Sequence, residues 1–491
     1  MRFPSLQMGK GCTVSDTLLR LESVSVSFLS GVRALADVTL SIHAGECVFL
    51  TGPSGSGKTT LLQLFRGLLG RHIPATVSGE IENKALREWG SVGLVFQNPE
   101  TQVFFQTVEE ELAFGAENLG LPPQRIRHEI EEILERLKIS HLRGRNPASL
   151  SSGEKQRVAI GSVLIMHPSL LLLDEPLSWL DRGGREELTR ILKALRGEGM
   201  TLVIADQVLD GLADLVDRLV VLDRGQLRSD LRLDGEDPVQ VLAGLGLAQP
   251  SENRLELPNG RPGGPREPVL FMKDFTFRYS GGGGVHRISL TLESAEILGI
   301  QGDNGSGKTT LLRAAAGLLQ AQEGEISVLG VQRSRPEKML GRVALVMQNP
   351  ERQLFEESAE AEVLFTLRRI RRSRSRKQDG PDLKNEVMEA LRRLDLQAVR
   401  ARNPLALSLG EQRRLVCACA MAPGPELLLL DEPTSGLDWP NRQLLINWVR
   451  DLRRKCGTAV MVASHDENLI ETLCDRRLRV ENGEWVRDAQ G

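Results

Sequence analysis

The stretch Gly52-Pro-Ser-Gly-Ser-Gly-Lys-Thr-Thr60 fits the pattern Gly-x-x-x-x-Gly-Lys-Ser/Thr, and Gly302-Asp-Asn-Gly-Ser-Gly-Lys-Thr-Thr310 fits it again. Each copy follows an apolar run and precedes a helical pattern, which is the context of a phosphate-binding loop (P-loop). Glycines let backbone N–H groups curve around a phosphate, and the following helix N-terminus favours an anion. The chain is therefore predicted to be α/β, with two P-loop nucleotide-binding domains that each have a mixed α/β core.

Both loops also supply side chains for a nucleotide. Lys58 and Lys308 place a positive charge at the β- and γ-phosphates, and the hydroxyls of Thr59 and Thr309 are candidate Mg²⁺ ligands. The alternative, a glycine-rich turn before a helix, does not account for two complete matches. The loop residues expected to bind the nucleotide are Gly52, Pro53, Ser54, Gly55, Ser56, Gly57, Lys58, Thr59 and Thr60, and Gly302, Asp303, Asn304, Gly305, Ser306, Gly307, Lys308, Thr309 and Thr310.

The duplication extends beyond the loops. Three further segments return in the same order: Gln-Asn-Pro, Leu-Ser-x-Gly-Glu and Leu-Leu-Leu-Leu-Asp-Glu-Pro. So long a period indicates two whole domains, each with a helical subdomain inserted at residues 99–168 or 350–423. We expect an N-terminal extension (1–17), a first domain (18–248, the first half), a linker rich in proline, glycine and charge (249–267) and a second domain (268–491, the second half).

Each Leu-Leu-Leu-Leu-Asp-Glu segment predicts a buried strand that ends in two carboxylates, Asp174 and Glu175 in the first half and Asp431 and Glu432 in the second. The first acid of each pair suits the Mg²⁺ shell. The second suits a general base that deprotonates the attacking water. A strand-end turn with solvated acids is the alternative, and it is weaker in a chain that also has a P-loop.

The segments 151–154 and 408–411 each fit a helix capping box, Ser-x-x-Glu. Each also has a glycine, Gly153 or Gly410, near the expected helix start. Such a helix start is an anion site as well, so its N–H groups could bind a γ-phosphate held by the other half.

Composition limits the class of protein. The chain has 491 residues, of which 41% are hydrophobic and 26% charged, with a net charge of −3. These values are typical of globular domains and exclude a largely disordered or fibrous chain. The slight acidity disfavours nucleic acid as the main partner. No segment has the apolar length of a membrane span or the pattern of a secretion signal, so we expect a cytoplasmic protein.

Together with Ala-Ser-His-Asp at residues 463–466, these motifs resemble the ATP-binding cassette (ABC) ATPases over nearly the whole chain, twice. The resemblance implies a head-to-tail sandwich in which two ATP molecules, with Mg²⁺, lie between the P-loop of one half and the Leu-Ser-x-Gly-Glu signature of the other. It also implies hydrolysis by attack of water on the γ-phosphate.

The resemblance assigns further roles residue by residue. Gln97 and Gln348 match the Q-loop glutamines that sense Mg²⁺ and water, and His465 matches the switch histidine that contacts the γ-phosphate. The remaining nucleotide-site residues that it implies are the adenine-stacking pair Phe28 and Tyr279, the D-loop acids Asp181 and Asp438, and the signature residues Ser151, Ser152, Gly153, Glu154, Ser408, Leu409, Gly410 and Glu411.

Two departures from the family pattern fall on one site. Gln207 stands where the second half has His465, and Leu409 replaces a small signature residue. In the sandwich, site one combines Lys58, Glu175 and Gln207 with the second signature, and site two combines Lys308, Glu432 and His465 with the first. We expect site two to perform most of the turnover, because glutamine has no titratable imidazole. The alternative is that both sites hydrolyse ATP.

Residues 97–122 and 347–365 resemble the ATPase of energy-coupling-factor (ECF) importers of vitamins, metal ions or similar small solutes. This resemblance implies a membrane coupling subunit, a substrate-binding membrane subunit and a location on the cytoplasmic face of the membrane. It places a groove for a coupling helix near residues 97–105 and 348–355. The acidic run 109–111 pairs with arginines of that helix or is a solvated face, and the basic run 368–377 is a loop or contacts lipid head groups.

Two other functions stay open. A tandem ATPase of a sugar-type importer has a similar length, but the Gln-Asn-Pro-x-x-Gln segment argues against it. An ABC ATPase that acts on ribosomes or nucleic acid would carry a long charged helical linker, cysteine-rich motifs or zinc insertions, and the sequence shows none of these.

Overall fold

The computed structural model describes residues 17–29, 31–87, 90–178, 180, 182–209, 211–233, 235–247, 268–303, 305–332, 335–373 and 381–486. The predicted linker and nearly all of the N-terminal extension lie outside these residues.

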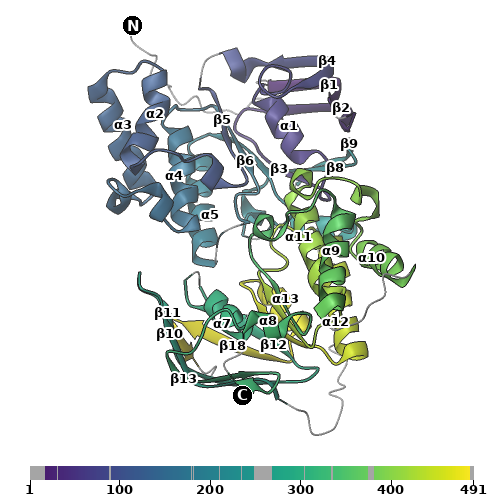
Figure 1. Ribbon diagram of the computed structural model, residues 1–491. Helices are drawn as coiled ribbons and strands as arrows, with labels where there is room; N and C mark the ends of the chain where they lie inside the picture. The colour runs from purple at the N-terminus through teal and green to yellow at the C-terminus, as the bar shows by residue number, and fades with distance from the viewer. Residues whose placement is uncertain are drawn as a thin grey trace.

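Each half is built on a six-stranded sheet, and the two sheets have the same strand order. In Figure 1 the first half lies above, in purple to teal, and the second half lies below, in green to yellow. The first five strands in each order are parallel and the last is antiparallel. In the first half the order is β5(Val92–Val95), β6(Leu170–Asp174), β7(Thr201–Ala205), β3(Cys47–Thr51), β8(Arg218–Asp223) and β9(Gln226–Arg232). In the second half it is β15(Val343–Val346), β16(Leu427–Asp431), β17(Ala459–Ala463), β12(Ile297–Gln301), β18(Arg476–Glu481) and β19(Glu484–Val486).

A smaller antiparallel sheet accompanies each six-stranded sheet. In the first half it consists of β2(Arg33–His43), β1(Thr17–Phe28) and β4(Ala75–Asn83). In the second half it consists of β11(Gly284–Glu293), β10(Pro268–Arg278), β13(Glu323–Val328) and β14(Val331–Gln332). The inner faces of β1 and β10 pack with the P-loop helices, α1(Lys58–Phe65) and α7(Lys308–Ala315), in one hydrophobic core per half.

The predicted helical subdomains are present in both halves. The first contains α2(Val108–Asn118), α3(Pro123–Arg136) and α4(Ser152–Leu164). The second contains α9(Ala359–Ser373), α10(Pro381–Arg393) and α11(Leu409–Met421). The other helices are α5(Arg182–Gly197), α6(Pro238–Gly244), α8(Pro336–Met339), α12(Trp439–Cys456) and α13(Glu467–Leu473).

The strand order explains how distant motifs meet. Because β3, β6 and β7 are parallel neighbours, the segments after their carboxyl ends lie at one edge of the sheet. Those segments are the P-loop, the pair Asp174-Glu175 and the stretch around Gln207. The second half repeats this edge with β12, β16 and β17, where the matching segments carry Lys308, Glu432 and His465.

Candidate active sites

At site one, the P-loop of the first half lies directly against the second half. The backbone N–H of Ser54 donates to Asp438 Oδ2 over 2.7 Å. A Cβ added to Gly410 would lie 3.1 Å from Ser54 Oγ, so the second signature faces the same loop. The structure thus brings together the P-loop of the first half with the D-loop and signature of the second.

At site two, a cleft of about 220 Å³ separates the P-loop of the second half from the signature of the first. Gln348, Thr309 and Asp431 line it from the second half. Ser152 and Lys155 line it from the first half, together with Glu100, whose carboxylate pairs with Lys155 over 2.6 Å. Both sites therefore have the head-to-tail composition expected from the motifs.

The first acid of each strand-end pair is buried beside the P-loop threonine. Thr309 Oγ1 donates to Asp431 Oδ2 over 2.7 Å, and Thr59 makes the matching bond with Asp174. Burial raises the pKa of Asp174 to about 7 and that of Asp431 to about 6. A buried carboxylate with a hydroxyl beside it is a set of hard oxygen donors that a divalent cation would stabilise, so these residues fit Mg²⁺.

Each P-loop lysine folds over its own loop. Lys58 Nζ donates to the carbonyls of Gly52 and Pro53 over 2.8 and 3.1 Å. Lys308 Nζ donates to those of Gly302 and Asp303 over 2.6 and 2.9 Å. Burial lowers the pKa of Lys58, although the carboxylate of Glu175 opposes this effect. Both amines are therefore held at the mouth of the loop, where a triphosphate would lie.

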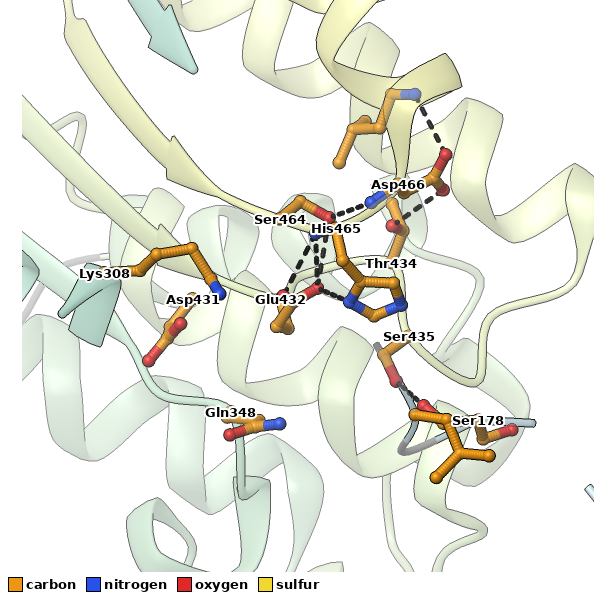
Figure 2. A network of polar contacts seen from close by, with 12 residues as sticks. Ser178, Lys308, Gln348, Asp431, Glu432, Thr434, Ser435, Ser464, His465 and Asp466 are labelled. Carbon is orange, nitrogen blue, oxygen red and sulfur yellow. Dashed lines mark hydrogen bonds and ion pairs between the residues drawn. The ribbon is translucent and has the colours of Figure 1, made fainter. Parts of the chain in front are cut away.

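The second acids have different partners in the two halves. Glu175 accepts hydrogen bonds from Gln97 Nε2 over 2.6 Å and from Gln207 Nε2 over 3.0 Å. Glu432 accepts them from Ser464 Oγ over 3.1 Å and from the backbone N–H of His465 over 3.1 Å, and His465 Nδ1 lies 2.9 Å from its Oε2 (Figure 2). An imidazole thus adjoins the base of site two, and two amides adjoin the base of site one.

The backbone at both acids is strained in the same way. Glu175 and Glu432 have φ values of 43° and 49°, in the left-handed region that residues with a Cβ seldom adopt. Strain of this kind persists only where the surroundings determine the conformation, and it clusters at functional sites. The duplicated strain supports a role for both carboxylates in chemistry.

Comparison with known proteins places the chain in a family. The model of the family described as "ABC transporter" matches residues 35–178 and 285–435, which is more than half of the chain. This chain belongs to the ABC transporter family.

Relatives match this chain over nearly its whole length. A putative ABC transporter ATP-binding protein of Methanosarcina acetivorans is 32% identical over 489 residues, covering 96% of this chain and 90% of that one. One of Treponema denticola is 34% identical over 497 residues, covering 96% and 97%. Among solved structures, an archaeal ribosome recycling factor, aABCE1, is similar with a TM-score of 0.61 at 21% identity, over 94% of this chain and 89% of that one. The chain is therefore an ATP-binding ABC ATPase with two P-loop domains.

The signature residues of this ABC ATPase have the geometry predicted for capping boxes. Ser151 and Ser408 begin α4 and α11, and each accepts a hydrogen bond from the backbone N–H three residues later. The side chains of Glu154 and Glu411 return to the serine N–H groups over 2.8 and 2.9 Å. Leu409 is the first residue of α11 and lies beside Gly436 of the D-loop segment, because its Cδ2 is 3.9 Å from the position of a Cβ there.

The two aromatic residues expected at adenine occupy equivalent turns. The N–H of Phe28 donates to the Val32 carbonyl over 2.9 Å, and that of Tyr279 donates to the Gly283 carbonyl over 3.1 Å. Phe28 packs against the hydrophobic core of its half, whereas Tyr279 is more exposed and contacts Phe277 edge to face. Their stacking on adenine remains a prediction, and Asp181 and Asn304 lie outside the described residues.

The three carboxylates of the acidic run 109–111 each have a partner within the first half. Glu109 bonds to Arg143 over 2.6 and 2.9 Å, and Glu110 caps α2 with Thr107. Glu111 is buried and accepts the N–H groups of Phe104 and Phe105 over 2.9 and 3.0 Å. Burial therefore removes Glu111 from any contact with a partner helix, whereas pairing of Glu109 and Glu110 with arginines of such a helix stays a prediction.

The sequence analysis missed three residues at the sites. Asp206 is buried beside Glu175, where the second half has Ser464. Arg413, 1% exposed, replaces Gln156 of the first signature helix and donates to the Gln348 carbonyl over 2.8 Å. Arg185 of the first half contacts His465 of the second. Alignment of the two halves could have found Asp206 and Arg413, but not the contact between halves.

Proposed function

We propose that this ABC ATPase energises an ECF-type membrane importer of a vitamin, metal ion or similar small solute. The observation that carries this proposal is an exposed aromatic side chain displayed beside the Q-loop in both halves. Phe104 is 66% exposed and Phe355 is 64% exposed. A soluble surface gains nothing from two duplicated, solvated phenylalanines, whereas a surface that binds an apolar helix does.

A buried carboxylate holds each of these phenylalanines in place. The N–H groups of Phe355 and Glu356 donate to Glu362 Oε2 over 2.9 Å each, as those of Phe104 and Phe105 do to Glu111. Two charge-assisted hydrogen bonds to one buried oxygen fix the turn. In each half the turn that carries the exposed aromatic side chain is therefore rigid and not a mobile loop.

The Gln-Asn-Pro-x-x-Gln segment ties this turn to the ATP site. Gln353 donates to the Leu345 carbonyl over 2.9 Å and accepts the N–H of Met347 over 2.8 Å, so it bridges β15 and the Q-loop. Gln102 makes the matching pair of bonds in the first half, where Gln97 Nε2 bonds to Glu175. A partner that moves the aromatic turn would therefore move the Q-loop glutamine against the catalytic acid.

The second half has a groove beside Phe355 that is lined largely by apolar side chains. Its volume is about 280 Å³, and Leu354, Phe355, Phe365 and Ile370 are among the side chains that line it. Arg369 lines the same groove, on a helix that also carries arginine at 368, 371 and 372. The matching helix of the first half, α2, carries only acidic charges. The Q-loop surfaces of the two halves therefore differ in charge, which favours one orientation of the membrane subunit.

Hydrolysis at site two would use the residues described above. Glu432 takes a proton from the attacking water, Gln348 orients that water, His465 orients Glu432, and Lys308 stabilises charge on the β- and γ-phosphates. The residues that would hold Mg²⁺ at this site are Thr309, Asp431 and Gln348, and at site one Thr59, Asp174 and Gln97. When bound, the cation neutralises negative charge that develops on the phosphates. We propose that site one turns over more slowly, because amides replace the imidazole at Glu175.

Among the residues that the structure describes, no helix is long and apolar enough to cross a membrane. We propose that separate membrane subunits complete the importer and that this ATPase binds to them at the cytoplasmic face. The relatives named as transporter ATP-binding proteins support this role. The likeness to the archaeal ribosome recycling factor shows the fold alone.

Capture from detergent-solubilised membranes tests the proposal. The tagged full chain should retain a polytopic membrane protein, and the double variant Phe104→Ser/Phe355→Ser should lose it. Ile81→Ser is a matched control, because Ile81 is 41% exposed on β4, away from both Q-loops in sequence and sheet. Retention of ribosomes or nucleic acid in place of a membrane protein would overturn the importer role.

A further inference from the structure

An arginine of the first half reaches the switch histidine of the second. Arg185 lies in the first turn of α5, and its Nη2 is 2.6 Å from His465 Nε2. Its Nε also donates to the Leu180 carbonyl over 3.1 Å, which anchors the guanidinium beside the loop that precedes the helix. The contact joins residues 280 positions apart in the chain, at site two.

The duplication supplies an internal comparison for this arginine. Arg442 occupies the same place in the second half, because its Nε donates to the Leu437 carbonyl over 2.9 Å. Its Nη1, however, bonds within its own half to Asp466, over 2.8 Å. The strand register pairs Ala205 with Asp174 and Ala463 with Asp431, so Val208 stands at the position of Asp466. The first half thus has a valine at the position of the carboxylate that bonds to Arg442.

The contact fixes the protonation pattern of the histidine ring. A guanidinium only donates hydrogen bonds, so His465 Nε2 must be the acceptor of the bond from Arg185. The ring proton then lies on Nδ1, which is 2.9 Å from Glu432 Oε2 and donates to it (Figure 2). A chain of hydrogen bonds consequently runs from Arg185 through His465 to the acid expected to act as general base at site two.

We propose that Arg185 is a positioning residue for site two, which holds His465 in the Nδ1-protonated tautomer and so orients Glu432. This proposal rests on the ATPase activity and on no claim about the transported solute. Site one has no counterpart, since Gln207 bonds to Glu175 and to the Gly436 carbonyl, and Arg442 is held by Asp466. Glu432 of site two is thereby linked to an arginine of the first half through His465, whereas Glu175 of site one is linked to a backbone carbonyl of the second half through Gln207.

Steady-state hydrolysis in a Glu175→Gln background isolates site two and tests the proposal. We expect Arg185→Gln to lower kcat by about tenfold with a KM for ATP within about twofold, the order of loss typical of partners that orient a functional histidine. Arg185→Lys should recover part of the loss, because an ammonium also donates to Nε2.

A second variant leaves Arg185 itself intact. Val208→Asp restores the carboxylate found in the second half, so it should draw Arg185 away from His465 and lower kcat by a similar factor. Val208→Asn is the matched control, since it has the same shape without the charge, and it should keep most of the activity. Equal losses in the Asp and Asn variants, or an unchanged kcat in both Arg185→Gln and Val208→Asp, would overturn the proposal.

The tautomer of His465 can also be measured directly, and it would not change if the role of Arg185 were only structural. In ¹⁵N-histidine-labelled protein, the His465 resonance, assigned by its loss in His465→Gln, should show an unprotonated Nε2 and a protonated Nδ1. In Arg185→Gln the two tautomers should mix, while the midpoint of thermal unfolding stays close to that of the unchanged chain. The same tautomer in both proteins would contradict the role of Arg185.

Discussion

Ser54 and Asp438 join the two halves through a single hydrogen bond of 2.7 Å from the P-loop N–H to the D-loop carboxylate. Asp438 does two tasks at once, because its other oxygen accepts the N–H of Asn441 and caps α12. A substitution there is therefore expected to act both on the second half alone and on the closure of site one.

Asp438→Ala should lower the stability of the second half by about 1 kcal/mol, the usual contribution of an N-cap, and shift its thermal midpoint by roughly 2–4 °C. Asp438→Asn keeps an oxygen for the cap but turns an NH2 group toward the Ser54 N–H, which then has no acceptor, so it should weaken ATP binding with little change in the midpoint. Calorimetry and nucleotide titration measure the two effects separately. Identical binding by both variants and the unchanged chain would show that the bond between the halves does not matter for ATP.

The two strand-end glutamates should differ in their effect on turnover. Glu432→Gln removes the base that adjoins His465, and we expect it to lower steady-state ATP hydrolysis by at least about 100-fold, as for a general base. Glu175→Gln removes an acid already held by Gln97 and Gln207, and we expect a loss of less than about threefold. The comparison needs both proteins at saturating Mg²⁺ and ATP. Equal losses would favour two working sites.

Asp206 should make the first half less stable at neutral pH than it is in acid. Burial, and then the charge of Glu175, raise the pKa of Asp206 to about 7, from an ordinary value near 3.8. A carboxyl whose folded pKa is raised binds more protons when folded, so its contribution is full below about pH 4 and is lost as the pH rises through about 7.

Asp206→Ser gives the first half the residue type that the second half has at the equivalent position, Ser464, whose hydroxyl donates to Glu432. It should raise the stability of the first half by on the order of 2 kcal/mol at pH 8 and leave it nearly unchanged at pH 4. Thermal midpoints across this range provide the measurement. A gain of the same size at both pH values would mean that the charge of Asp206 is not the cause.

Sequence reasoning located the motifs at the sites because their chemistry is local. A glycine loop, a strand that ends in Asp-Glu and a Ser-x-x-Glu helix start each depend on residues a few positions apart, and duplication doubled every signal. It also placed Gln207 opposite His465, because strands β7 and β17 align without a gap.

The features that the sequence did not predict depend on burial and on contacts between the two halves. Glu111 looks like part of an acidic surface, yet it is 3% exposed, because the turn before α2 folds its N–H groups onto the carboxylate. Arg185 and His465 meet only because the halves pack head to tail, and no local pattern encodes that distance. The significance of Val208, which stands at the position of Asp466, follows only from the structure, in which Arg442 bonds to Asp466.

The two capping serines allow a final prediction that separates a structural role from a role at the nucleotide. Ser151 and Ser408 cap α4 and α11 in the same way, so replacing either with alanine should cost each helix about 1 kcal/mol.

The nucleotide sites to which the two serines belong differ, however. Ser151 belongs to site two, whose cleft is lined by the neighbouring Ser152 and by Asp431, whereas Ser408 belongs to site one, where Gly410 faces Ser54. Ser151→Ala should therefore lower ATP hydrolysis by about 100-fold, the order of loss when one donor to a developing charge is removed, while Ser408→Ala should lower it by less than about threefold. A matched pair of thermal midpoints controls for the lost cap, and equal losses of activity with equal midpoints would leave the serines with the cap as their only role.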